Sequence, residues 1–148
     1  MPFYRPVINA GRDFGGPVAY GMDQNITIEN GSMVAVSNTG ANAGYAVVPS
    51  SALPNAYVVG VCMDGGATNG ATRGATKVTA DPGVFPFANS GVNPCTQADV
   101  GAKVYASDGG TISRDSADGP LAGTLRQFNS ADPHGLPCYV EITGAPRA

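Results

Sequence analysis

The sequence contains no tryptophan, only two lysines and few charged residues of either sign. Charged residues make up 13% of its 148 residues, about half of the ~25% that is common in globular domains. The net charge is −3, and the six arginines are scattered along the chain. A protein that binds a phosphate backbone presents a basic patch on one face, and this composition does not provide one. We therefore expect no nucleic-acid partner.

Long apolar runs are also missing. Nowhere do about 18 apolar residues follow one another, which is the length that a membrane-spanning helix needs. The start, MPFYRPVINAGRDFGG, has no apolar stretch of about 7–15 residues behind a positive region, as a secretion signal would have. The sequence thus predicts neither a membrane partner nor a signal peptide.

The three cysteines are odd in number and form no Cys-x-x-Cys pair, which argues against a disulfide framework. Reduced thiols in a cytosol-like compartment are expected instead. Cys62 lies in the run VVGVCM and Cys138 opens the run CYVEI, so these two are predicted to lie in the core, where a free cysteine behaves as a small hydrophobe.

Glycine and proline, at 21 and 12 residues, interrupt short runs of valine, isoleucine, threonine and aromatic residues. Long helices are excluded because glycine costs about 1 kcal/mol and proline about 3 kcal/mol in a helix interior. The chain is therefore predicted to be an all-β single domain with tight turns. We expect an extended N-terminal arm over residues 1–14, a β domain over residues 15–143 and a C-terminal tail over residues 144–148.

Several β-rich runs bounded by turn residues predict individual strands. The run Tyr57–Met63 is the most continuous and is expected to be a central strand. Asp108-Gly109-Gly110 is expected to supply the positive φ of a tight hairpin. The other predicted strands lie within 25–30, 31–38, 44–50, 76–80, 84–87, 103–106, 111–113, 121–128 and 138–143. A single helical turn is expected from Thr96, with a capping box to Asp99.

The N-terminal arm carries apolar and aromatic residues that Pro2 and Pro6 interrupt. Because these prolines withhold backbone donors and favour extended geometry, the arm can pair along one edge at most. Arginine is favoured in protein interfaces and lysine is depleted there, although solvated arginines remain an equal alternative. The candidate partner contacts in this arm are Phe3, Tyr4, Arg5, Val7, Ile8, Arg12 and Phe14.

The segment GATNGATRGATK, residues 66–77, repeats Gly-Ala-Thr three times. It lacks the Gly-Lys-Ser/Thr ending and the following helix of a phosphate-binding loop. If it is extended, glycines and threonines line one side and the other side is small with an occasional cation. We interpret it as a long connection that either lies on another surface or is a loop with no contact at all. Its candidate contacts are Thr68, Asn69, Thr72 and Arg73.

The side chains that catalysis or metal binding needs are sparse. His134 lies in DPHG without a G-x-S-x-G elbow or similar element, which indicates a surface turn. Asp108, Asp115 and Asp118 lack the spacing of a calcium loop and its distal glutamate. The sequence therefore predicts no enzyme activity, no catalytic or metal-binding residues and no cofactor.

The last ninety or so residues contain a specific order of motifs. VVGVCMDGGA is followed by DPGVFPFA, then by TQADVGAKVYASDGGTIS, LAGTLRQFN and the closing CYVEIT. The most telling part is A-D-V-G-x-x-V-Y followed by an Asp-Gly hairpin, a glycine-containing strand and a final V-x-I strand. This order resembles the structural cement, or head decoration, proteins of tailed bacteriophages.

The resemblance implies a compact β-barrel or β-sandwich, often oligomeric, that binds the capsid exterior and bridges neighbouring major capsid proteins without enzyme activity. The chain would then be assembled in the cytoplasm of a bacterial host, and its own copies, as a dimer or trimer, would be further partners. Two alternatives stay open. One is a phage tail or adaptor structural protein, and the other is a carbohydrate-binding β-domain, which the absence of tryptophan disfavours.

Overall fold

A computed structural model describes residues 16–53 and 55–143 of the chain. The predicted N-terminal arm, 1–14, and tail, 144–148, lie outside the described residues. The strands are β1 (Val18–Gly21), β2 (Thr27–Glu29), β3 (Met33–Val36), β4 (Ala46–Val47), β5 (Tyr57–Val61), β6 (Gly66–Thr68), β7 (Lys77–Ala80), β8 (Gly83–Asn89), β9 (Lys103–Asp108), β10 (Thr111–Ser113), β11 (Leu121–Phe128) and β12 (Cys138–Ile142). Two 3₁₀ helices, η1 (Gln97–Asp99) and η2 (Ser116–Asp118), complete the elements. The predicted all-β class is confirmed.

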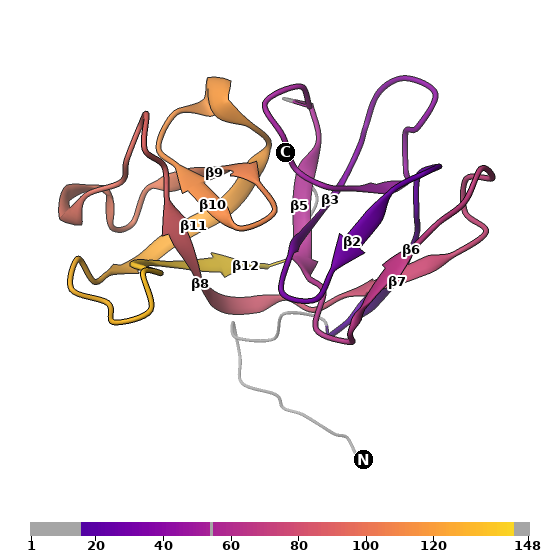
Figure 1. Ribbon diagram of the computed structural model, residues 1–148. Coiled ribbons are helices and arrows are strands. Elements are labelled where there is room, and N and C mark those ends of the chain that lie inside the picture. The colour runs from indigo at the N-terminus through magenta and orange to yellow at the C-terminus, as the bar shows by residue number, and fades with distance from the viewer. Residues whose placement is uncertain (1–15, 54, 144–148) are drawn as a thin grey trace, which may run out of the picture.

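The C-terminal strands form a closed five-stranded barrel, seen on the left of Figure 1. Its strand order is β12-β8-β10-β9-β11, and an antiparallel pairing of β11 with β12 closes the ring. The pairing of β8 with β10 is parallel and involves only two residue pairs, Thr111 with Ala88 and Ile112 with Asn89. Fully buried Val104, Leu125 and Val140 belong to the core that fills the barrel. Because the pairing of β8 with β10 is so short, residues 83–87 of β8 pair on one side only, with β12.

The N-terminal strands extend this sheet through β5, β3 and β4, with two-stranded ribbons β1–β7 and β2–β6 beside them (Figure 1). Strand β3 lies between two cores: Met33 and Ala35 belong to the barrel core, whereas Val34 and Val36 belong to a second core beneath the ribbons. All four side chains are therefore buried. Burial on both faces explains why this strand, like β5, is a continuous apolar run rather than an alternating one.

The predicted hairpin of β9 and β10 is confirmed, with β9 continuing to Asp108. The expectation that Gly109 and Gly110 supply positive φ is wrong, because neither backbone lies in the left-handed region. Gly109 instead allows a close approach: a Cβ there would meet the Ser32 hydroxyl, which would have to rotate away. The hairpin turn therefore packs directly on the β2–β3 turn, and the Met33 N–H donates to the Gly109 carbonyl at 2.8 Å.

The helical turn at Thr96 is confirmed, since the Thr96 N–H donates to Asp99 Oδ2 at 2.7 Å. It is not the only such turn among the described residues, because Asp115 caps η2 by accepting from the Ala117 N–H at 2.9 Å. Cys62 and Cys138 are buried as predicted, and Cys95 is buried as well. No helix within the described ranges is long and apolar enough to cross a membrane.

Candidate contact surface

The Gly-Ala-Thr segment is folded onto the N-terminal strands. Its first three residues form β6, which pairs antiparallel with β2, and the hydroxyls of Thr27 and Thr68 are hydrogen-bonded at 2.9 Å. Residues 69–76 are not extended, so the predicted alternation of two faces holds only for residues 66–68. The expectation that the segment ends in a strand is confirmed by β7.

The buried side chain of Asn69 attaches this segment to the N-terminal strands by hydrogen bonds. Its side-chain Nδ2 donates to the carbonyls of Met22, Asp23 and Thr72 at 3.1, 2.9 and 3.0 Å. Asn69 is only 2% exposed, so its place among the candidate contact residues is a correction. The Asn69 amide is used within the chain: it is a second donor to the Met22 and Thr72 carbonyls, beside the Gly74 and Ala75 N–H groups, and it pairs the Asp23 carbonyl.

Arg73 provides a second attachment, because its Nε donates to Asp23 Oδ1 at 2.7 Å. Asn42 Nδ2 donates to Asp23 Oδ2 at 3.1 Å, and the Gln24 N–H also donates to this carboxylate. Burial alone would raise the pKa of Asp23, but the hydrogen bonds from Asn42, Gln24 and Arg73 together hold that pKa below its ordinary value. The Arg73 guanidinium thus acts within the chain.

The remaining residues predicted in this segment stay at the surface. Thr68 and Thr72 are exposed, and the Arg73 side chain is 32% exposed. Thr68 lies on β6 and Thr72 in the loop after it, so the structure places them on one folded segment. The arm residues Phe3, Tyr4, Arg5, Val7, Ile8, Arg12 and Phe14 lie outside the described residues.

The β2–β6 ribbon has one buried and one exposed face. Ile28 packs into the second core together with Ala67, while Thr27, Glu29 and Thr68 are on the opposite, exposed face. Alternation along the strands separates these two sets. Apolar burial thus fixes the orientation of the ribbon and directs Glu29 outward.

Gly66 pairs with Glu29 across the ribbon and has φ of 88°. A Cβ at Gly66 would lie 2.8 Å from the Ile28 carbonyl oxygen, so only glycine fits. The missing side chain leaves the glutamate without a cross-strand neighbour of any bulk. A hollow of about 510 Å³ lies on this side of β2, lined by both residues and by others of β2, β6 and the turns that follow β2 and precede β6.

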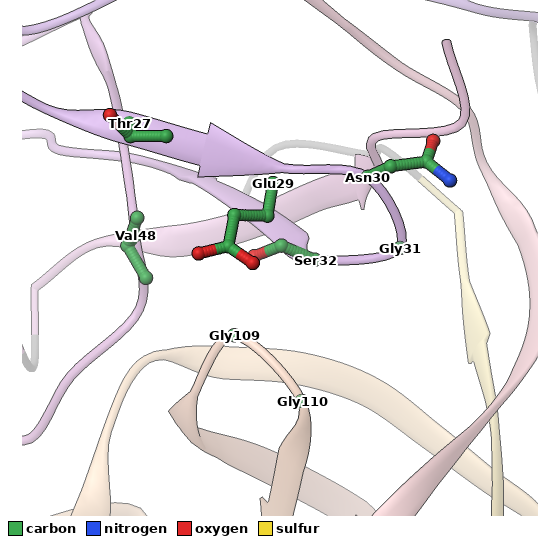
Figure 2. Close-up of a pocket in the computed structure, with 8 residues that line it drawn as sticks. All are labelled: Thr27, Glu29, Asn30, Gly31, Ser32, Val48, Gly109 and Gly110. Carbon is green, nitrogen blue, oxygen red and sulfur yellow. The ribbon is translucent and has the colours of Figure 1, made fainter. Parts of the chain in front are cut away.

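A second hollow, of about 370 Å³, lies between the β2–β3 turn and the β9–β10 turn. Figure 2 shows the Glu29 carboxylate directed into this space, beside Ser32 and across from Gly109 and Gly110. Glu29 lines both hollows, and within the described part of the chain no basic side chain pairs with it. Sequence reasoning missed Glu29; its only signal was being one of two glutamates in the chain.

The residues considered for catalysis do not converge. His134 is exposed in the loop between β11 and β12, where its backbone N–H donates to Asp132 Oδ2 at 3.0 Å, so the predicted surface turn is confirmed. The described residues include no group of three or more His, Cys, Asp or Glu side chains placed to hold a metal ion. The Cys62 S–H donates a hydrogen bond to Asp64 Oδ1 at 3.4 Å, and burial raises the pKa of the Cys62 thiol.

No family model, no curated protein and no solved structure matches the chain. What the surface itself offers is a carboxylate between two shallow hollows whose walls are mostly main chain, glycine and short hydroxyl side chains. Such walls present backbone N–H and C=O groups to whatever lies against them. The arrangement suits an extended partner segment that carries a basic side chain.

Proposed function

We propose that this protein is a non-enzymatic structural protein of a bacteriophage particle, a cement or decoration protein that binds the capsid exterior and bridges major capsid proteins. The observation that carries the proposal is where the motifs of the resemblance fall. DPGVFPFA, the A-D-V-G-x-x-V-Y hairpin, LAGTLRQFN and CYVEIT supply all five barrel strands, and VVGVCM supplies β5 beside them. The motifs therefore describe one folded unit rather than scattered turns.

The surface chemistry supports a protein partner. In Figure 1 the ribbon β2–β6 lies to the right of β5 and the barrel, and Asn69 and Arg73 attach the segment that follows it. A rigid surface loses little conformational entropy when it binds. The Glu29 hollows would accept a basic side chain of the major capsid protein, and the hydroxyls of Thr27 and Thr68 would satisfy neighbouring main-chain groups.

Repetition over the particle supplies the binding strength that one small module lacks. An interface of about 1,600 Å² is standard for a specific complex, and each bridging copy engages more than one capsid protein. Once one contact has formed, the second is effectively intramolecular. The same proposal includes assembly in the host cytoplasm. It also includes a dimer or trimer of the chain, because closed point-group symmetry favours such oligomers.

Binding to particles tests this function directly. Particles that lack the protein are mixed with the purified full chain or with a variant that lacks residues 1–12, and bound protein is measured after sedimentation. We expect the full chain to bind the head and to raise the temperature at which heads release DNA. The truncated chain should give the same circular dichroism spectrum but bind far more weakly.

Full-strength binding by the truncated chain would count against the arm as a contact. Two outcomes would overturn the proposal itself. Label confined to the tail would favour a tail or adaptor protein. Absence of the protein from purified particles, together with micromolar binding in a glycan screen, would favour the carbohydrate-binding alternative.

A further inference from the structure

Two of the three cysteines meet inside the barrel, although they are far apart in sequence. Cys138 begins β12, and its Cα partner across the sheet is Phe87 of β8. Asn89 lies two residues after Phe87 and so points to the same face of β8. The Asn89 side chain holds Cys95 at two points, because Nδ2 donates to the Cys95 carbonyl at 2.9 Å and the Cys95 N–H donates to Oδ1 at 2.8 Å.

This arrangement brings the two thiols together in one apolar core. Cys95 is 1% exposed and Cys138 is fully buried, and both belong to the core of the barrel. The interaction between the two thiols raises the pKa of Cys138 and lowers that of Cys95. Cys62 belongs to the other core and interacts with Asp64 instead.

We propose that Cys95 and Cys138 are a disulfide site: reduced while the chain is in a reducing compartment, and joined when a low-molecular-weight disulfide such as oxidised glutathione is present. Cys138 pairs with Phe87, and Asn89 on the same face of β8 holds Cys95, so the fold brings the two cysteines to one place, as a bridge requires. The backbone of Cys95 is fixed by Asn89, so little rearrangement separates the dithiol from the bridge.

The sequence of steps follows from which cysteine can be uncovered. Cys95 lies in a loop whose neighbours Gly91, Val92 and Pro94 are exposed, whereas Cys138 lies within a strand that pairs on both sides. Local opening of this loop breaks the two hydrogen bonds to Asn89 and uncovers Cys95 first. The uncovered Cys95 then reacts as its thiolate, which is the form that attacks a disulfide.

Oxidised glutathione is the oxidant in this thiol–disulfide exchange. The Cys95 thiolate attacks one sulfur of oxidised glutathione, the glutathione S–S bond breaks, and one glutathione leaves. When the loop recloses, the Cys138 thiolate attacks the Cys95 sulfur of the mixed disulfide and releases the second glutathione. The two protein thiols lose two electrons and two protons, and one oxidised glutathione becomes two reduced glutathione molecules.

The bridge would tie the loop before η1 to the last strand and would enclose β9, β10 and β11. A cross-link of this kind stabilises mainly by restricting the unfolded chain. For a chain with the proposed capsid function, formation of the bond after the particle leaves the host would strengthen a barrel that had folded in the reduced state. That consequence rests on the proposed function, whereas the bond itself does not.

The experiment uses the purified full chain and oxidised glutathione, both on the folded protein and during refolding from denaturant. Remaining thiols are blocked with an alkylating reagent, and intact mass and peptide maps are recorded. We expect a loss of two hydrogens, one cross-linked peptide pair containing Cys95 and Cys138, and an alkylated Cys62. The melting temperature of the oxidised form should be roughly 5–10 °C higher than that of the reduced form.

Variants separate the site from general oxidation. C62A should form the bond and show the same rise in melting temperature, whereas C95A and C138A should show neither. If either of these does not fold, the wild-type peptide map still decides the matter. A dithiol that persists after refolding with oxidised glutathione, a stable glutathione adduct at Cys95, or a bridge that involves Cys62 would overturn the proposal.

Discussion

Arg73 Nε lies 2.7 Å from Asp23 Oδ1, and this pair joins the loop after β6 to the turn after β1. Four residues before Arg73, Asn69 holds the same turn through the Met22 and Asp23 carbonyls. The first two Gly-Ala-Thr units are thus each followed by a residue that anchors the segment. The repeat therefore carries its structural information in the residues that interrupt it.

The two anchors should differ in strength. N69A removes three hydrogen bonds, of which the one to the Asp23 carbonyl is not duplicated by a backbone N–H, so the free energy of unfolding should fall by about 2 kcal/mol. R73A removes a partly exposed ion pair and should cost about 1 kcal/mol or less. T72A, an exposed position in the same loop, is the matched control and should be near neutral. Denaturant unfolding measures all three, and an equal effect of N69A and T72A would contradict the buried anchor.

Acid should weaken the fold through Asp23. The folded-state pKa of Asp23 is lower than the unfolded value of about 3.9, so the stabilisation is complete above that value and is lost as the pH falls through it towards the folded pKa. Asp118, which accepts from Ser113, and Asp132, which accepts from the Leu136 N–H, also have lowered pKa values and add in the same direction.

Urea unfolding between pH 6 and pH 2.5 should therefore show a midpoint that is flat above about pH 5 and falls below about pH 4. In D23N the fall should be shallower, because the side chain no longer titrates. A steeper fall in D23N than in the natural chain would show that the Asp23 carboxylate is not stabilised by its partners.

Strands with clear turn signals were predictable from the sequence. Leu121–Phe128 and Thr111–Ser113 have the predicted bounds, because glycine or proline precedes each strand and polar turn residues follow it. Strands that depend on distant partners were not predictable. The short β1 exists through its pairing with β7, and β6, with the sequence Gly-Ala-Thr, exists through its pairing with β2. Neither has a local pattern strong enough to indicate a strand.

The candidate surface was predictable only in part. Thr68 and Thr72 were expected at the surface and are exposed there, but Asn69 is internal because its carbonyl partners come from the β1–β2 turn. Glu29 was missed because its hollows exist through glycines brought together by the fold, Gly66 across the ribbon and Gly109 from the barrel. No local pattern encodes such a meeting of distant residues.

Glycine in the middle of β11 should prove essential. A Cβ at Gly123 would overlap the Glu141 carbonyl on the paired strand β12, so G123A forces apart two strands that close the barrel. We expect the free energy of unfolding to fall by about 3 kcal/mol, as overpacking does. G91A is the matched control, since a Cβ at Gly91 meets nothing within 4 Å and its φ is not in the left-handed region. Thermal unfolding that gives the same midpoint for both variants would contradict this close approach.

The Glu29 hollows should contribute electrostatically to capsid binding. E29Q removes the carboxylate without changing shape, and because Glu29 is exposed and unpaired within the described chain, unfolding should be unaffected. Binding to protein-free particles should weaken about fivefold at low salt, as expected for loss of one ion pair of about 1 kcal/mol. The difference should disappear near 1 M salt, where charges are screened beyond about 3 Å. Q127K, at an exposed position of β11, changes the net charge of the chain by the same amount as E29Q and is the control. If Q127K weakens particle binding as much as E29Q does, the cause is net charge rather than the Glu29 carboxylate.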